Sequence, residues 1–195
     1  MHRRGVTRRE RPPGYPAAYE STVVLEDKRQ VRVRPVVPED VEELAAAIAR
    51  VDVETIRRRF LGGSAPHTRA QLARLVELDY VHRFALAAFA RDGTGVGIAR
   101  YEGETTWPDV DVAVVVDPAW RGVGLARVLM AGVLRRAVEQ EAAGLTADFY
   151  ADNERVHNLL AEAGLPEQRS TAFGVVEDHI SLSGARAREI TATPS

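Results

Sequence analysis

A short loop with two glycines separates the most apolar strand-like segment of the chain from its most apolar helix-like segment. Residues 110–130 read VDVAVVVDPAWRGVGLARVLM, with Gly122 and Gly124 just before the helical part. The first amide N–H groups of a helix lack partners within it, and the helix dipole favours an anion beside them. Glycine lets the backbone approach a ligand closely, and Arg121 adds a positive charge. Residues 121–126, called the phosphate loop below, therefore predict a phosphate site.

An ordinary turn between a strand and a helix is the alternative interpretation of the phosphate loop. Such a turn requires neither Arg121 nor the small residue Ala126. No lysine follows the glycines, so the loop is not that of a nucleoside triphosphatase. A dinucleotide-binding loop would need a small residue where this chain has Arg127, and it would follow the first strand rather than the fourth.

Several other reaction classes lack the residues they need. The chain has no cysteine, which excludes disulfides, thiolate metal sites and a cysteine-linked acyl-enzyme. Its five histidines show no zinc-ligand spacing, so we expect no metal. The segment GGSAP at 62–66 is not the G-x-S-x-G nucleophile elbow and gives no support to a serine hydrolase.

Length and composition predict one globular domain with short tails. The 195 residues carry a formal net charge of −2 and are 45% hydrophobic, which favours neither a nucleic-acid nor a membrane partner. There is no apolar run of the roughly 18 residues that span a bilayer, and no h-region of a secretory signal. The absence of cysteine fits a cytoplasmic protein, which is the expected location. The expected division is a disordered tail over 1–21, the domain over 22–183 and a flexible tail over 184–195. A basic arm that contacts nucleic acid is the alternative for the first tail.

The patterns around the phosphate loop predict a mixed α/β domain. VRVRPV at 31–36 alternates as a half-buried strand does, and Thr68 with Gln71 forms a capping box. Asp92-Gly93 suits a tight hairpin turn, and the arginines at 57–59 are interpreted as a solvated helix face. The sum is a sheet of about seven strands, partly antiparallel and flanked by helices. Strands are expected at 31–36, 84–90, 95–101, 109–116, 145–150, 168–173 and 175–182, and helices from Pro38, at 54–60, from Thr68, at 124–140 and before Gly164.

Two segments of the chain resemble the GNAT superfamily of N-acyltransferases. RGVGLA matches the pattern [RQ]-x-x-G-x-[GA] of that superfamily's acyl-CoA pyrophosphate loop, and the preceding strand ends in V-x-P as it does there. ADNERVHNLLAEAGL is similar to its later strand–asparagine–helix segment, with Asn153 at the asparagine. The resemblance covers residues 22–183 and includes the order of the elements.

A narrower resemblance lies upstream of the phosphate loop. Residues 31–62 and the segment LDYVHRFALAAFA are similar to bacterial protein-lysine acetyltransferases. In those proteins the catalytic domain is often fused to a cyclic-nucleotide-binding or acyl-CoA-synthetase-like module, and neither module is present in this sequence. The resemblance implies acetyl-CoA as co-substrate and a protein lysine as acceptor.

The resemblance also implies which residues bind acetyl-CoA. The central strand of a GNAT sheet is splayed from its neighbour, and its backbone pairs with the pantetheine arm, a role that corresponds here to Val114, Val115 and Val116. Asn153 corresponds to the superfamily's asparagine, with a simple helix cap as the alternative. The pyrophosphate would be bound by Arg121, Gly122, Val123, Gly124, Leu125, Ala126 and Arg127.

A base on the same strand is implied as well. A lysine amine has a pKa of about 10.4, so its attack near neutral pH requires a base. The lysine acetyltransferases use a strand carboxylate that corresponds here to Asp111, with aspartate in place of the usual glutamate. Asp109 lies on the same strand face and is the second candidate. The alternative for both residues is a solvated strand edge. Leu160 stands where many GNAT enzymes have a tyrosine acid, so no general acid is assigned.

Two functions from different classes remain open from the sequence. The first is an acetyl-CoA-dependent N-acetyltransferase in which a primary amine attacks the thioester directly. The second is a non-catalytic acyl-CoA sensor that keeps the phosphate loop without turnover, and the aspartate at 111 favours it. A nucleotide-binding domain is a third idea. The expected partners are an acyl-CoA and an amine acceptor, with no membrane and no nucleic acid, and a homodimer stays open.

Overall fold

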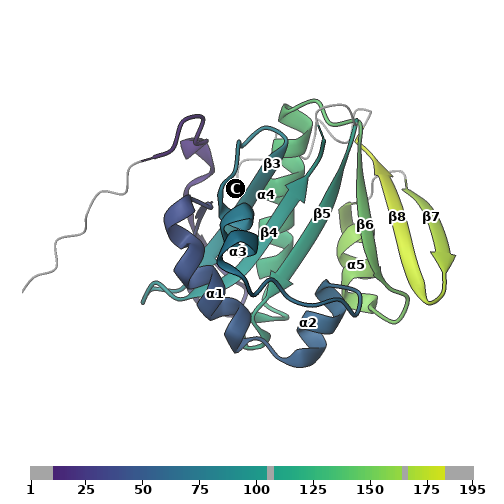
Figure 1. Cartoon of the computed structure of the whole chain (residues 1–195), viewed down its shortest axis with the longest axis horizontal. Coiled ribbons are helices and arrows are strands. Elements are labelled where there is room, and N and C mark those ends of the chain that lie inside the picture. The colour runs from purple at the N-terminus through teal and green to yellow at the C-terminus, as the bar shows by residue number, and fades with distance from the viewer. Residues whose placement is uncertain (1–10, 105–107, 164–166, 183–195) are drawn as a thin grey trace, which may run out of the picture.

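Eight strands form a single mixed sheet. The computed structural model describes residues 11–104, 108–163 and 167–182. The strand order is β1-β2-β3-β4-β5-β6-β8-β7, and all neighbours are antiparallel except β5 and β6 (Figure 1). The strands are β1 Ser21–Val24, β2 Gln30–Pro35, β3 Arg83–Phe89, β4 Gly95–Glu102, β5 Asp109–Val116, β6 Gly144–Tyr150, β7 Glu167–Ala172 and β8 Val175–Ser181.

Five α-helices accompany the sheet in the described residues. The expected capping box of Thr68 and Gln71 opens α3, and the expected hairpin turn at Gly93 joins β3 to β4. Three 3-10 turns complete the described elements: η1 Ala17–Tyr19, η2 Pro38–Asp40 and η3 Pro118–Trp120. The helices are α1 Val41–Arg50, α2 Val53–Arg59, α3 Arg69–Val76, α4 Leu125–Glu139 and α5 Glu154–Ala163. None of them is both long enough and apolar enough to span a bilayer.

The N-terminal part of the domain extends further than predicted. The sheet has eight strands rather than about seven, because Ser21–Val24 pairs with β2 through a tight turn at which Lys28 has a φ of 71°. Residues 11–21, expected in the disordered tail, pack on the domain. Tyr19 is 6% exposed and makes an edge contact with Phe84 at 5.3 Å between ring centroids. Burial of this aromatic surface offsets the conformational entropy that is lost when the segment becomes ordered. Residues 1–10 and 184–195 lie outside the described residues.

Helices cover both faces of the sheet. On one face, α4 and α5 bury Leu129, Val133 and Leu160 against the larger core. On the other face, α1 and α3 cover a smaller core around Val36 and Val76. Figure 1 shows α1 and α3 in front of the sheet and α4 behind it. A helix as apolar as α4 requires this burial, since leaving one core side chain exposed costs about 1.5–3 kcal/mol.

The central parallel pair of strands is splayed, as the resemblance implied. Asp109, Val110 and Asp111 pair with Gly144, Leu145 and Thr146, and the register ends there. From residue 112 onward β5 and β6 diverge, and α2 lies against both strands at the wide end (Figure 1). A gap opens in this way beside the half of β5 that leads to the phosphate loop.

Candidate active site

The phosphate loop has the backbone conformation that its glycines permit. Gly122 and Gly124 have φ values of 72° and 83°, in the left-handed region, and Gly124 is the N-cap of α4. Val128 donates the first hydrogen bond of the helix, to the Gly124 carbonyl at 3.1 Å. Within the described part of the chain, the amide N–H groups of residues 122–127 donate to no acceptor. These free donors at a helix N-terminus match the chemistry of a diphosphate.

Arg121 is not the free positive charge that the sequence predicted, because other protein groups bind its guanidinium. Its Nε donates to the Val116 carbonyl at 3.1 Å, and its Nη2 donates to the Thr55 hydroxyl at 2.7 Å. Both bonds direct the guanidinium toward β5 and α2. The side chain therefore joins the phosphate loop to two neighbouring elements, while the backbone amides remain available to a ligand.

Arg127 is also held by protein groups. Its guanidinium pairs with Glu162 of α5 at 2.8 Å and with Glu26 of the β1–β2 turn at 3.1 Å. Glu26 lies so close to the loop that a Cβ placed on Gly124 would be 2.9 Å from its carboxylate. Gly124 is thus favoured by its left-handed φ, whereas the exposed Glu26 side chain could move to make room for a Cβ.

The three valines expected to pair with pantetheine lie on the splayed half of β5. Val114, Val115 and Val116 pair with β4 along one edge of the strand. Their other edge faces the gap, because the pairing with β6 ends at Asp111. An extended ligand arm can pair with such an edge as an added strand does.

The two candidate carboxylates have different surroundings. The Asp109 carboxylate lies 2.9 Å from His179 Nε2 of β8 and is engaged there. Asp111 makes no hydrogen bond or ion pair with a described residue, and solvent reaches its side chain. Neighbouring protein atoms nevertheless exclude part of its hydration, and this partial desolvation raises the pKa of Asp111, while the positive charge of Arg59 acts in the opposite direction. A carboxyl of raised pKa without a fixed partner suits a base better than one held by histidine.

Charged side chains around Asp111 were not found from the sequence. The sequence interpretation placed Arg59 on a solvated helix face. In the structure it lies on the same face of α2 as Ile56, three residues earlier. That spacing could have indicated that Arg59 faces the domain. Partial desolvation, with the negative charge of Glu177, raises the pKa of the exposed Asp148 on β6 as well. Arg100 and Glu102 of β4, which form an ion pair at 2.6 Å, complete the cluster of charged residues around Asp111.

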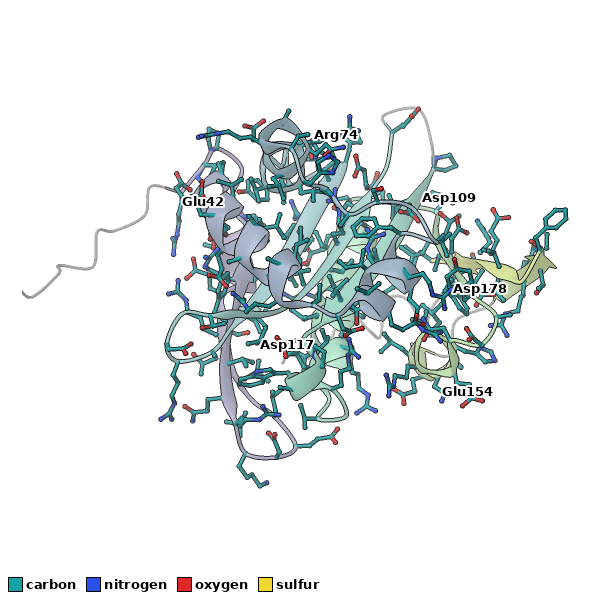
Figure 2. The ribbon with its side chains drawn as sticks, turned by 60° about the horizontal axis from the view of Figure 1, so that its bottom comes forward. Glu42, Arg74, Asp109, Asp117, Glu154 and Asp178 are labelled. Carbon is teal, nitrogen blue, oxygen red and sulfur yellow. The ribbon has the colours of Figure 1, made fainter. Side chains whose placement is uncertain are left out.

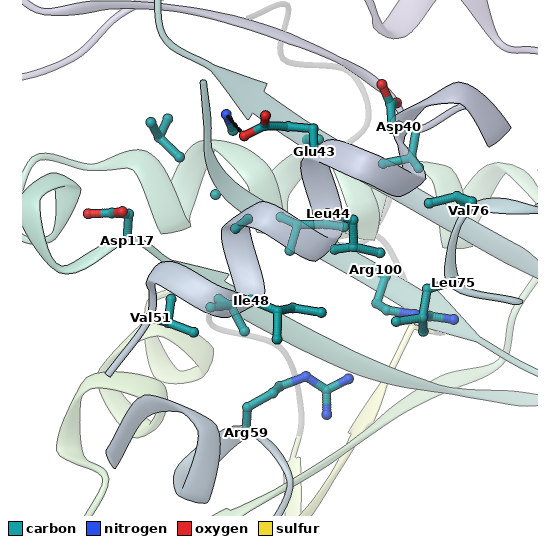
Figure 3. Close-up of a pocket in the computed structure, with 18 of the residues that line it drawn as sticks. Asp40, Glu43, Leu44, Ile48, Val51, Arg59, Leu75, Val76, Arg100 and Asp117 are labelled. Atoms are coloured by element: carbon teal, nitrogen blue, oxygen red, sulfur yellow. Dashed lines mark hydrogen bonds between the residues drawn. The ribbon is translucent and has the colours of Figure 1, made fainter. Parts of the chain in front are cut away.

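An apolar cavity of about 130 Å³ lies between the helices and the sheet beside this cluster. Leu44 and Ile48 of α1 cover it, and Val115 of β5 reaches it from below. Figure 3 shows Arg59 and Arg100 projecting toward the same part of this cavity. Figure 2 labels charged residues at several places around the sheet and shows Asp109 close to β8. The described residues contain no group of three or more potential ligands that could hold a metal ion.

Asn153 lies between β6 and α5. Its carbonyl accepts hydrogen bonds from Val156 at 3.1 Å and His157 at 3.2 Å, so its backbone begins the helix as a cap does. Leu160 is 5% exposed and belongs to the core, where it can supply no acid. Gly164, the expected end of this helix, lies outside the described residues.

A sheet splayed beside a glycine loop at a helix N-terminus defines the class of acyl-CoA-dependent N-acyltransferases. The chain belongs to the GNAT acetyltransferase family, because the profile of the acetyltransferase (GNAT) domain matches residues 30–166. It is therefore an N-acetyltransferase, and enzymes of this family use acetyl-CoA.

Known relatives agree with this assignment. An acetyltransferase of Pseudomonas aeruginosa is 30% identical over 148 residues, which are 74% of this chain and 80% of the relative. The GNAT domain of Streptomyces lividans PAT is 29% identical with a TM-score of 0.78, and the match covers 86% of this chain and 99% of that domain. A cAMP-binding acyltransferase from Mycobacterium smegmatis shares the fold at 24% identity and a TM-score of 0.61. That match covers 91% of this chain and 52% of the mycobacterial one.

Proposed function

We propose that the protein transfers the acetyl group of acetyl-CoA to a primary amine, with a protein lysine as acceptor and Asp111 as general base. The position of Asp111 carries this proposal. It is the last residue of β5 that pairs with β6, so its side chain lies where the gap opens. The phosphate loop lies at the opposite end of the same strand. The resemblance of the upstream segments to bacterial lysine acetyltransferases supports the lysine.

The free amides of the phosphate loop would bind the diphosphate, and the open edge of β5 would pair with the pantetheine arm. Each hydrogen bond to a charged phosphate oxygen contributes about 1.5–3 kcal/mol. The bound thioester supplies an activated acyl carbon. Asp111 takes one proton from the acceptor ammonium, directly or through a water, because aspartate is one methylene shorter than the family's glutamate. The amine nitrogen then bonds to the acyl carbon, the carbon–sulfur bond breaks, and CoA leaves as a thiolate. The second proton of the attacking nitrogen passes to the thiolate, directly or through water, which leaves a neutral amide and free CoA thiol.

Release of CoA thiol distinguishes this proposal from the acyl-CoA sensor. Purified protein is incubated with acetyl-CoA and lysine-containing peptides, and free thiol and acetylated peptide are measured together. Equal amounts of both products, well above those of Asp111→Asn, support the enzyme. Binding of acetyl-CoA without thiol release beyond that of Asp111→Asn would instead support the sensor.

The matched control is Asp92→Asn in the β3–β4 turn. This variant removes one carboxylate from a turn whose residues pair with neither β5 nor β6, and it should retain full turnover.

A cytoplasmic location and a homodimer stay predictions of the sequence.

A further inference from the structure

Arg59 is a positive charge whose N–H groups have no acceptor among the described residues, although its guanidinium carbon lies 5.1 Å from the centroid of the Phe60 ring. It is the last residue of α2, and its two neighbours are both paired: Arg57 with Glu54 at 2.8 Å and Arg58 with Asp152 at 2.8 Å. Arg59 makes no hydrogen bond or ion pair with any described residue, although its side chain lines the apolar cavity. The Phe60 ring and the attraction of Asp111 and Glu102 offset part of the cost of burying this charge. Its N–H donors still lack an acceptor, which an anionic ligand would supply.

A second guanidinium adds to the positive charge at the same place. Arg100 is 8% exposed and pairs with Glu102, which is shared with Arg74 and Arg83. Burial lowers the pKa of Arg100, and the positive charge of Arg59 lowers it further, so the two arginines repel one another. Figure 3 shows both side chains entering the cavity, Arg59 from α2 and Arg100 from β4. An anion between them would relieve this repulsion.

Asp111 supplies the opposite charge next to this pair. It faces the same side of the sheet as Arg100, because Arg100 pairs with Ala113 and Glu102 with Asp111. Arg59 and Asp111 attract one another, yet they form no ion pair. The site therefore presents a carboxylate for an ammonium group and guanidinium groups for an anion, at separate positions.

We propose that the amine acceptor carries a carboxylate and that Arg59, assisted by Arg100, binds it. The planar guanidinium fork matches a carboxylate in a bidentate arrangement. This inference rests on the proposed transfer of an acetyl group to an amine with Asp111 as base, and a free amino acid as acceptor would replace the proposed protein lysine. The carboxylate belongs either to a free amino acid or to an acidic side chain beside a lysine in a peptide, and both present the same chemistry to Arg59.

Calorimetry of acid and amide pairs tests the inference without requiring turnover. The probes are glycine, β-alanine and γ-aminobutyrate with their amides, which vary the distance between amine and carboxylate. A second set is a blocked Lys-Glu dipeptide and its Lys-Gln counterpart. Each is titrated into wild-type protein, Arg59→Gln and the control Arg69→Gln, which removes an exposed charge on α3.

Arg59→Gln should weaken binding of the acids by about ten- to a hundred-fold and leave binding of the amides and of acetyl-CoA unchanged. Selectivity within the small acids identifies a free amino acid, and selectivity confined to Lys-Glu identifies a peptide. Equal affinity of wild type for acid and amide, or equal losses for both in Arg59→Gln, would overturn the inference. Thiol release is measured separately, so absence of turnover with an intact acid preference would count against the proposed function alone.

Discussion

The guanidinium of Arg121 donates to the hydroxyl of Thr55 at 2.7 Å, across 66 positions of the sequence. The same guanidinium donates to the Val116 carbonyl at the end of β5. A single side chain thus connects the phosphate loop, the splayed strand and the helix that carries Arg59. This contact therefore links the proposed acetyl-CoA site to the proposed acceptor site.

Removing the Thr55 hydroxyl should weaken acetyl-CoA binding. Thr55→Val keeps the shape of the side chain but leaves Arg121 without its acceptor on α2, and a partly exposed bond of this kind contributes about 1 kcal/mol. We expect the dissociation constant for acetyl-CoA to rise about five-fold in calorimetry. Thr22→Val on exposed β1 is the control and should bind as wild type does. An unchanged constant for Thr55→Val would show that the contact does not position the loop.

A side chain at Gly124 should abolish acetyl-CoA binding. Gly124→Glu forces a left-handed φ of 83° on a bulky residue, places its Cβ against Glu26 and adds negative charge where the diphosphate would lie. We expect no heat with acetyl-CoA in calorimetry.

Gly174→Glu is a matched control for this substitution. Its φ of 77° imposes similar strain in the turn between β7 and β8, with open space around its Cβ. It should bind acetyl-CoA normally. Binding by Gly124→Glu with wild-type affinity would mean that the phosphate loop is wrongly assigned.

Asp111 should determine the acidic side of the pH profile. Because partial desolvation raises its pKa, Asp111 is protonated at a higher pH than an ordinary aspartate. Turnover should therefore fall as the pH decreases through that raised pKa. The same shift means that ionised Asp111 costs stability at high pH, a cost that is relieved as the pH falls.

Asp111→Asn should lower kcat by about 10²–10⁴-fold while leaving KM for acetyl-CoA nearly unchanged. Steady-state rates across the pH range, with the melting temperature as a check on folding, provide the measurement. A larger loss in Asp109→Asn would transfer the role of base to that residue. An acidic limb that persists in Asp111→Asn would assign it to another group, such as Asp148.

A buried ion pair should stabilise the segment that enters α1. The Arg34 and Asp40 side chains are both 6% exposed and bond at 2.6 Å, and Asp40 also accepts the Val37 N–H at 2.9 Å. Asp40→Ala leaves the guanidinium buried without its carboxylate and should reduce the free energy of unfolding by about 3–5 kcal/mol. Urea denaturation measures this loss.

The exposed pair of Asp27 and Arg29 provides the comparison. Asp27→Ala should leave the urea midpoint almost unchanged, because solvent screens the charges. The double variant Arg34→Met/Asp40→Leu should recover most of the loss seen with Asp40→Ala, since no buried charge remains unpaired. If Asp40→Ala behaved as Asp27→Ala does, the buried pair would contribute nothing to the fold.

Local chemistry made much of the fold predictable from the sequence. Gly122 and Gly124 indicated a left-handed turn, and Thr68 with Gln71 indicated the start of a helix, because each effect acts within a few residues. The alternation of β5 placed Asp109 and Asp111 on one face for the same reason. The strand Ser21–Val24 was missed, since its short length provides little periodicity and its pairing with β2 stabilises it.

The sequence by itself determined the family, the left-handed glycines before α4 and the strand that carries the candidate base, because these depend on residue types at short spacing. Only the tertiary structure decided the partners of the charges. His179, 70 positions from Asp109, engages that carboxylate and leaves Asp111 free. Thr55 engages Arg121, and the fold leaves Arg59 facing a cavity next to Arg100. Charge interactions depend on distance and burial in space, which the order of residues along the chain does not contain.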